Sequence, residues 1–286
     1  MSFKEILLHV DNARNHEMRI DLAVALTRRH EAHLVGLAGY EPMPVLGLST
    51  ASTGSYLDVQ TMDMLQQQER DRALEGASDE GERFRATAER AGISYEWRIV
   101  EGELAHLVTH HARYADLVIL GQSAPDEPAP GSAGHLGESV LLGAGRPVLM
   151  VPYAGRFEQV GERVLVMWNA TREASRALHD AMPLLRTASE VKVLTVVEAG
   201  DEGDGSQSPA IDITHHLARH GVAATATTTV AEDIDIGDLI LSRAADFGSD
   251  LIVMGGYGHS PLREWALGGA TRSLLQHMTV PVLLSH

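Results

Sequence analysis

The order of apolar runs in the first half of this sequence is repeated in the second half. Asp116 and Asp250 each precede an apolar run of strand length, Pro147 and Pro281 each precede another, and both pairs are 134 positions apart. A glycine-containing loop and a helical segment separate the two runs in each copy. Strand, loop, helix and strand in this order are typical of a parallel α/β unit. The repeat therefore predicts two copies of one α/β fold in a single chain.

Each copy is expected to hold five strands. The apolar runs place them at 4–10, 32–38, 94–100, 116–121 and 147–151, and again at 163–168, 191–197, 223–230, 251–254 and 280–284. Helical spacing predicts helices at 15–30, 57–91, 104–114, 136–142, 171–185, 211–220, 235–247 and 270–278. The predicted fold class is α/β, with two tandem, open, five-stranded parallel sheets flanked by helices, in domains 1–155 and 160–286 joined near 156–162. Asp11 and Asn169, which end the first strand of each copy, are 158 positions apart, so the first copy carries 24 extra residues, expected within 40–72.

The net charge of the chain is −16, and it contains no cysteine. Non-specific binding to nucleic acid or to anionic membranes depends on clustered Lys and Arg, so neither partner is expected. The lack of cysteine excludes disulfides, thiolate metal sites and thiol nucleophiles. No apolar run reaches the roughly 18 residues of a membrane span, and the first residues lack the layout of a signal peptide. We therefore expect a cytoplasmic protein.

Glycines cluster after the strand expected at 251–254. Gly255, Gly258 and Gly268 have the spacing G-x2-G-x9-G, and Gly269 follows directly. Glycine has no Cβ, so backbone amides there can approach a ligand, and the following helix adds unpaired amides and the positive end of its dipole. The spacing fits neither the Walker A loop nor the dinucleotide fingerprint. A phosphate-binding loop is therefore expected here.

This loop resembles the ATP-binding loop of the universal stress protein family, G-x2-G-x9-G-Ser/Thr. Gly269 stands where the ATP binders of that family have Ser or Thr, and Thr271 supplies a hydroxyl two residues later. The resemblance covers essentially the whole chain and implies the tandem form of that fold, which is Rossmann-like and adenine nucleotide alpha hydrolase-like. It implies ATP or a related adenine nucleotide as ligand, with Mg²⁺ as an accompanying ion. It also implies that 148–151 and 282–284 pair the two copies as an internal pseudo-dimer, which can form a homodimer in turn.

In that family the ligand lies between the first and fourth strands, where an acidic residue holds the nucleoside and the glycine loop holds the phosphates. In the second copy Asn169 replaces the acid, which weakens the expected hydrogen bond by about 1 kcal/mol. Val197 and Val230, near the ends of the second and third strands, are candidates for the adenine pocket, with ordinary core valines as the alternative. His259, inside the glycine loop, is expected to contact phosphate or solvent.

The first copy keeps Asp11, Gly121 and Gly134 at the matching positions. Ala124 replaces the second glycine, and three prolines between 125 and 130 remove amide donors from the loop. We therefore expect the first nucleotide site to be degenerate and the first domain to be structural.

No arrangement in the sequence combines a base, a nucleophile and a stabiliser, so no catalytic residue is assigned and at most weak ATP hydrolysis is expected. His216 and His220 have zinc-ligand spacing on a helix, but the sequence points to no third ligand, and no metal site is predicted. The predicted function is that of a tandem universal stress protein that responds to a nucleotide in stress or signalling, with binding in the second domain. Two alternatives stay open: an interaction or scaffold module that binds no nucleotide, and a weak ATPase.

Overall fold

The computed structural model describes residues 2–42, 59–124, 126, 135–198, 209–231, 234–257 and 268–286. In the first half the elements are β1 (Glu5–Val10), α1 (His16–His30), β2 (His33–Tyr40), α2 (Val59–Ala91), β3 (Ser94–Glu101), α3 (Leu104–Ala112), β4 (Leu117–Gly121), α4 (Leu136–Ala144) and β5 (Val148–Val151). In the second half they are β6 (Arg163–Met167), α5 (Arg172–Asp180), α6 (Met182–Leu185), β7 (Glu190–Glu198), α7 (Pro209–Arg219), β8 (Ala224–Ala231), α8 (Ile236–Phe247), β9 (Leu251–Gly255), α9 (Gly268–His277) and β10 (Val282–Ser285).

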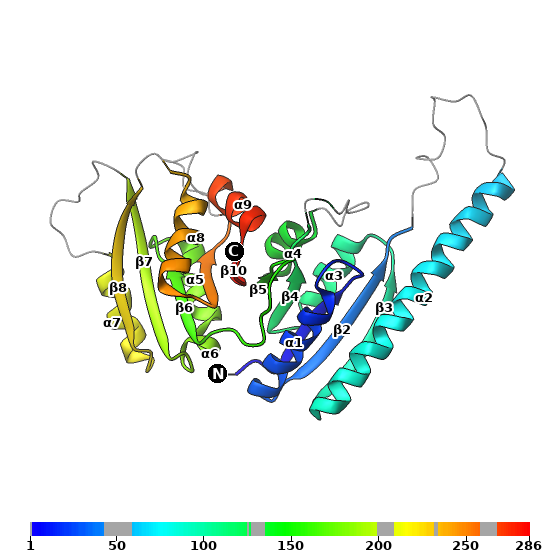
Figure 1. Cartoon of the computed structure of the whole chain (residues 1–286), viewed down its shortest axis with the longest axis horizontal. Helices are drawn as coiled ribbons and strands as arrows, with labels where there is room; N and C mark the ends of the chain where they lie inside the picture. The colour runs from blue at the N-terminus through cyan, green and yellow to red at the C-terminus, as the bar shows by residue number, and fades with distance from the viewer. Residues whose placement is uncertain are drawn as a thin grey trace, which may run out of the picture.

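All ten of these strands belong to one sheet, in the order β3-β2-β1-β4-β5-β10-β9-β6-β7-β8 (Figure 1). Neighbouring strands within each half are parallel. The halves join where β5 and β10 pair antiparallel, with Val282 opposite Met150 and Leu284 opposite Val148. The two predicted five-stranded parallel sheets are therefore confirmed, and so is the predicted pairing of the copies through their last strands.

Both faces of the sheet are buried. Along β1, Ile6 and Leu8 lie in a cluster with side chains of α1, α2, α5, α6 and α7, whereas Leu7 lies in a second cluster with α3, α4, α8 and α9. Each cluster contains residues of both halves, so the core continues across the antiparallel junction. Burial on both faces explains why these strands read as continuous apolar runs rather than as alternating ones.

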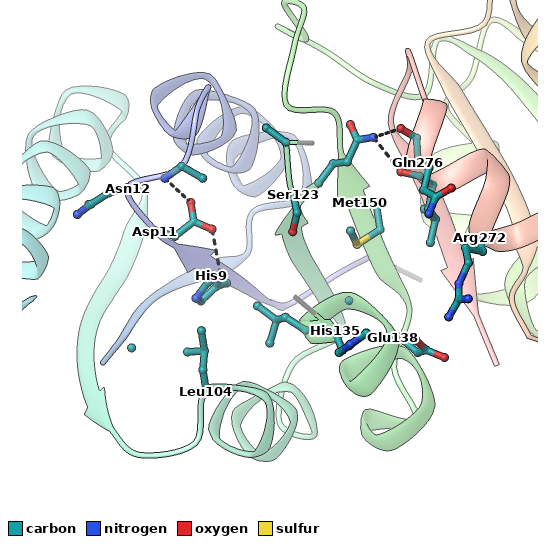
Figure 2. Close-up of a pocket in the computed structure, with 18 of the residues that line it drawn as sticks. His9, Asp11, Asn12, Leu104, Ser123, His135, Glu138, Met150, Arg272 and Gln276 are labelled. Atoms are coloured by element: carbon teal, nitrogen blue, oxygen red, sulfur yellow. Dashed lines mark hydrogen bonds and ion pairs between the residues drawn. The ribbon is translucent and has the colours of Figure 1, made fainter. Parts of the chain in front are cut away.

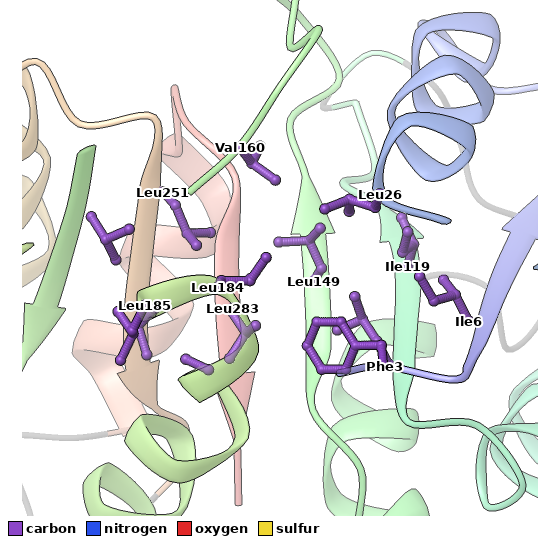
Figure 3. Packing of buried hydrophobic residues seen from close by; sticks show 14 of the residues in the cluster. Phe3, Ile6, Leu26, Ile119, Leu149, Val160, Leu184, Leu185, Leu251 and Leu283 are labelled. Atoms are coloured by element: carbon purple, nitrogen blue, oxygen red, sulfur yellow. The ribbon is translucent and has the colours of Figure 1, made fainter. Parts of the chain in front are cut away.

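The centre of the junction is a pair of leucines. Leu149 and Leu283 lie opposite each other in the β5–β10 ladder, and both are fully buried. Figure 3 shows them between the two halves, and the same cluster contains Val160 of the connecting segment and Phe3 near the N-terminus. Each fully buried apolar side chain contributes about 1.5–3 kcal/mol, so these contacts stabilise the two halves as a unit.

The repeated aspartates before the fourth strand of each half have the same structural role. Asp116 accepts a hydrogen bond from the backbone N–H of Glu5 (3.1 Å), the first residue of β1. Asp250 accepts one from the N–H of Arg163 (3.1 Å), the first residue of β6. Each aspartate thus ties the start of one strand to the turn before the neighbouring strand.

One predicted helix differs in the structure. The segment 171–185 forms two helices, α5 and α6, which meet at Ala181. Pro183 lies in the first turn of α6. Proline has no N–H to donate to the carbonyl four residues earlier, and its ring clashes with that carbonyl, so one continuous helix cannot pass through this point. The prediction of a single helix was wrong because it followed the apolar spacing across the proline.

His30, at the end of α1, is a buried histidine outside the ligand crevices. It is 6% exposed, its ring centroid is 4.8 Å from that of Phe3, and its Nε2 has no hydrogen-bond partner among the described residues. Burial, helped by Arg29 and Lys4, lowers the pKa of His30 from 6.5 to about 4. Unfolding restores the higher value, so the stability contributed by the neutral ring is complete above pH 6.5 and is lost as the pH falls toward 4.

Between pH 7 and pH 5, the wild type is therefore expected to lose about 1–2 kcal/mol more unfolding free energy than His30→Gln. Urea unfolding at the two pH values measures this difference. His215→Gln, which changes an exposed histidine of α7, is the matched control and should follow the wild type. Equal losses in the wild type and in His30→Gln would contradict the assignment.

Candidate functional site

A cavity of about 920 Å³ opens at the carboxyl ends of β1 and β4 in the first half. These strands are neighbours, but β1 is followed in the sheet by β2 on one side and β4 by β5 on the other. Where strand order reverses in this way, a crevice forms beyond the strand ends, and open α/β sheets bind their ligands there. The volume falls within the roughly 300–1,000 Å³ of typical small-molecule sites.

The walls of the cavity come from both halves of the chain (Figure 2). The first half contributes the segments that follow β1 and β4 and the first turn of α4, with polar side chains from His9, Asp11, Asn12, Ser123, His135 and Glu138. The second half contributes Tyr257, two residues after the end of β9, and one face of α9 with Arg272, Leu275 and Gln276. Apolar surface is supplied by Leu104, Leu136 and Met150.

Asp11 forms an ion pair with the buried Arg19 of α1. The Arg19 guanidinium fills the space beside Gly121, where a Cβ would lie 1.5 Å from its Nη1 atom. Asp11 also accepts a hydrogen bond from the N–H of Ala13 (3.1 Å). Burial by itself raises the pKa of Asp11, but Arg19 and His9 outweigh it and hold that pKa below its usual value. The cavity thus contains an ionised carboxylate whose charge is balanced by Arg19.

His9 lies beside this carboxylate. Its side chain is 3% exposed, and Nδ1 is 3.6 Å from the Asp11 Oδ2 atom with no hydrogen-bond partner among the described residues. Burial lowers the pKa of His9 more than Asp11 raises it, and Arg19 lowers it further, so the imidazole is neutral. A buried polar atom without a partner costs about 1–3 kcal/mol, which a ligand that hydrogen bonds to Nδ1 would recover.

Gln122 joins the cavity wall of the first half to that of the second. Its Nε2 donates to the backbone carbonyls of Leu275 (2.8 Å) and Gln276 (3.0 Å) in the last turn of α9. Its Oε1 accepts from the N–H of Tyr153 (3.2 Å), and the side chain is buried. Because the last carbonyls of a helix have no partner within the helix, this amide caps α9 and holds it against the first half.

Comparison with known proteins identifies the family of the second half. Residues 161–286 match the family model described as the Universal stress protein family. The second half of the chain is therefore a universal stress protein domain. A universal stress protein from Archaeoglobus fulgidus DSM 4304 has the same fold over 98% of this chain and 95% of its own, at 17% identity and a TM-score of 0.72. The tandem arrangement of the fold is therefore confirmed.

Two further solved structures are similar to the whole chain or to part of it. A functionally unknown protein from Pseudomonas aeruginosa PAO1 matches 99% of this chain and 92% of its own, at 14% identity and a TM-score of 0.58. A universal stress protein solved in complex with cAMP matches 54% of this chain and 100% of its own, at 16% identity and a TM-score of 0.36. No curated protein matches the sequence.

The crevice of the second half differs from that of the first. A Cβ at Gly255 would lie 2.6 Å from the backbone of Glu173 and Ala174, so α5 begins directly on the end of β9. Asn169 takes part in a local turn, in which its Oδ1 accepts from the Thr171 hydroxyl (2.8 Å) and N–H (3.3 Å). Close packing of helix on strand therefore occupies the space that Arg19 occupies beside Gly121.

The other predicted site residues of the second half lie at three places. Val197 and Val230 are partners in the β7–β8 ladder, and Val230 is 42% exposed. Gly268 begins α9, Gly269 is exposed, and Thr271 is fully buried. Gly258 and His259, and Gly134 of the first half, lie outside the described residues.

Next to His216 and His220 lies a third histidine, which the sequence did not indicate. The rings of His216 and His220 lie 5.4 and 6.2 Å, centroid to centroid, from the ring of His179 in α5. Within the part of the chain that the structure describes, no group of three or more metal-ligating side chains is arranged to hold an ion. The same described part contains no helix with the length and apolar character of a membrane span.

Several site residues were missed at the sequence level, among them His9, Gln122 and Arg272. His9 sits among apolar strand residues, so its position in β1 alone could have marked it as buried. Gln122 directly follows the fourth strand, a position that open α/β sheets place at the crevice. For Arg272 no local signal exists, because its role depends on which element of the other half faces α9.

Proposed function

We propose that this protein binds an adenine nucleotide and acts through binding, with little or no catalysis. The observation that carries the proposal is the cavity of about 920 Å³ at the strand-order reversal between β1 and β4, with the carboxylate of Asp11 at its floor. An acidic residue there, after the first strand, is what the resemblance to nucleotide-binding universal stress proteins led us to expect.

The lining of the cavity suits a nucleoside. The Asp11 carboxylate can accept hydrogen bonds from sugar hydroxyls, which are stronger than neutral ones because the acceptor is charged. The unpartnered Nδ1 of His9 offers one further hydrogen bond. Leu104, Leu136 and Met150 supply the apolar surface that a base needs.

The glycine loop of the second half remains a second candidate site for the same ligand. Its support is the G-x2-G-x9-G spacing and the start of α9 at Gly268, which leaves unpaired amides at a helix N-terminus. The close approach of α5 to Gly255 narrows the space next to this loop. The open cavity of the first half and the close packing beside Gly255 therefore favour the first-half cavity as the principal site.

Ser123→Trp is expected to weaken ATP binding at least tenfold, because an indole at this exposed rim position would fill the cavity. Isothermal titration calorimetry measures the affinity, and Ser123→Ala, which removes only the hydroxyl, should bind within about twofold of the wild type. Assays of phosphate release on the same samples should show no turnover that accounts for the signal. If the wild-type protein bound no ATP, the proposal would be overturned. If binding were lost in Gly258→Val but not in Ser123→Trp, the site would lie in the second half.

A further inference from the structure

The cavity of the first half is completed by the second half. Arg272, Leu275 and Gln276 are spaced i, i+3 and i+4 on α9 and therefore share one face of that helix, and this face lines the cavity. The Gln122 amide holds the same turn of α9 in place through its two hydrogen bonds. The position of Arg272 over the cavity is thus set by contacts across the junction (Figure 2).

We propose that Arg272 binds the phosphate of a nucleotide in this cavity, so that the site is built by both halves of the chain. The inference rests on the proposed function, since it names the anion contact of the same site.

The charges of the cavity leave Arg272 available for an anion. Asp11, one of the carboxylates that line the cavity, is already paired with Arg19. Arg272 is exposed and forms no ion pair with any described residue. A guanidinium presents paired N–H donors that match phosphate oxygens, and such charge-assisted hydrogen bonds are about twice as strong as neutral ones.

The opposite wall offers further donors. α4 is nine residues long, and the side chain of its N-cap residue, His135, does not accept a hydrogen bond from the first backbone amides of the helix, which are the groups that bind anions at helix N-termini. The buried, unpartnered Nδ1 of His9 in the same cavity is an independent indication that a ligand completes it. The first copy also needs a substitute donor, because Ala124 and the prolines that follow replace its glycine loop.

Glu138, in the first turn of α4, is the carboxylate that opposes an anion here. Glu138, Tyr257 and Arg272 line the same cavity. The pKa of Tyr257 is raised, mainly by burial and also by Glu138, while Arg272 acts in the opposite direction. Arg272 and Glu138 should therefore affect a charged ligand in opposite directions, while an uncharged nucleoside should respond to neither.

The test uses the full chain with Gly258→Val as background, so that the second-half loop does not contribute. In this background Arg272→Gln is expected to weaken binding of ATP and AMP at least tenfold and to leave adenosine within about twofold. Glu138→Gln is expected to tighten ATP binding and to leave adenosine unchanged. Arg85→Gln, on the exposed side of α2, is the matched control and should bind ATP like its background. Calorimetry at constant ionic strength gives all these affinities.

Two results would overturn the inference. ATP affinity that is unchanged by Arg272→Gln, in a protein whose binding is lost on Ser123→Trp, would leave the cavity as the nucleotide site without this contact. Weakening of ATP binding by Arg272→Gln that occurs in Ser123→Trp with the Gly258 loop intact, but not in the Gly258→Val background, would assign Arg272 to the glycine loop of its own half. Wild type that binds neither ATP nor adenosine would instead overturn the proposed function, and this inference with it.

Discussion

Asp11→Ala is expected to lower the free energy of unfolding by about 1.5–3 kcal/mol, the range for a hydrogen bond to a charged group, because it leaves the buried Arg19 without its partner. Arg19 is 3% exposed, and among the described residues its guanidinium hydrogen bonds to Asp11 alone. Without the carboxylate, the buried guanidinium keeps its charge but loses this partner. Urea unfolding at pH 7 measures the change.

The internal repeat supplies the matched control for this experiment. Asn169 stands at the position equivalent to Asp11, but the residue equivalent to Arg19 is Ala177. Asn169→Ala removes only the local hydrogen bonds to Thr171, so a loss of no more than about 1 kcal/mol is expected. Similar losses in the two variants would show that the Asp11–Arg19 pair does not stabilise the first half.

Leu283→Ala is expected to cost about 2–5 kcal/mol, because it removes a fully buried side chain from the antiparallel junction and leaves a cavity there. The loss should be felt in both halves, since the cluster around Leu283 includes Leu149 and Phe3 of the first half. Chemical denaturation combined with hydrogen exchange of β1 and β6 measures the effect in each half.

Leu142→Ala serves as control for the junction, because this leucine of α4 is 46% exposed and its removal should change stability by about 0.5 kcal/mol at most. If Leu283→Ala lowered the protection of β6 but left β1 at its wild-type level, the two halves would be independent domains. The continuous core and the single sheet lead us to expect that they are not.

Much of the fold could be predicted because its signals are local. Apolar runs of strand length, helical spacing and the exact repeat of Asp116–Pro147 at Asp250–Pro281 placed nearly every described element within a few residues. The one split helix followed from Pro183, which an apolar pattern does not register. The site was harder to predict. The glycine spacing drew attention to the second half, whereas the cavity of about 920 Å³ lies in the first, beside Asp11.

The sequence by itself determined the α/β class, the duplication, the pairing of the last strands by resemblance, and the identity of Asp11 as a crevice residue. Only the tertiary structure decided that Arg19 fills the space beside Gly121, that Gln122 caps α9, and that Arg272 lies over the cavity of the other half. The physical reason is that spacing along a chain records which face of an element is apolar and where a strand ends. It does not record which distant element packs against that face, and both the cavity and its charges are made by that packing.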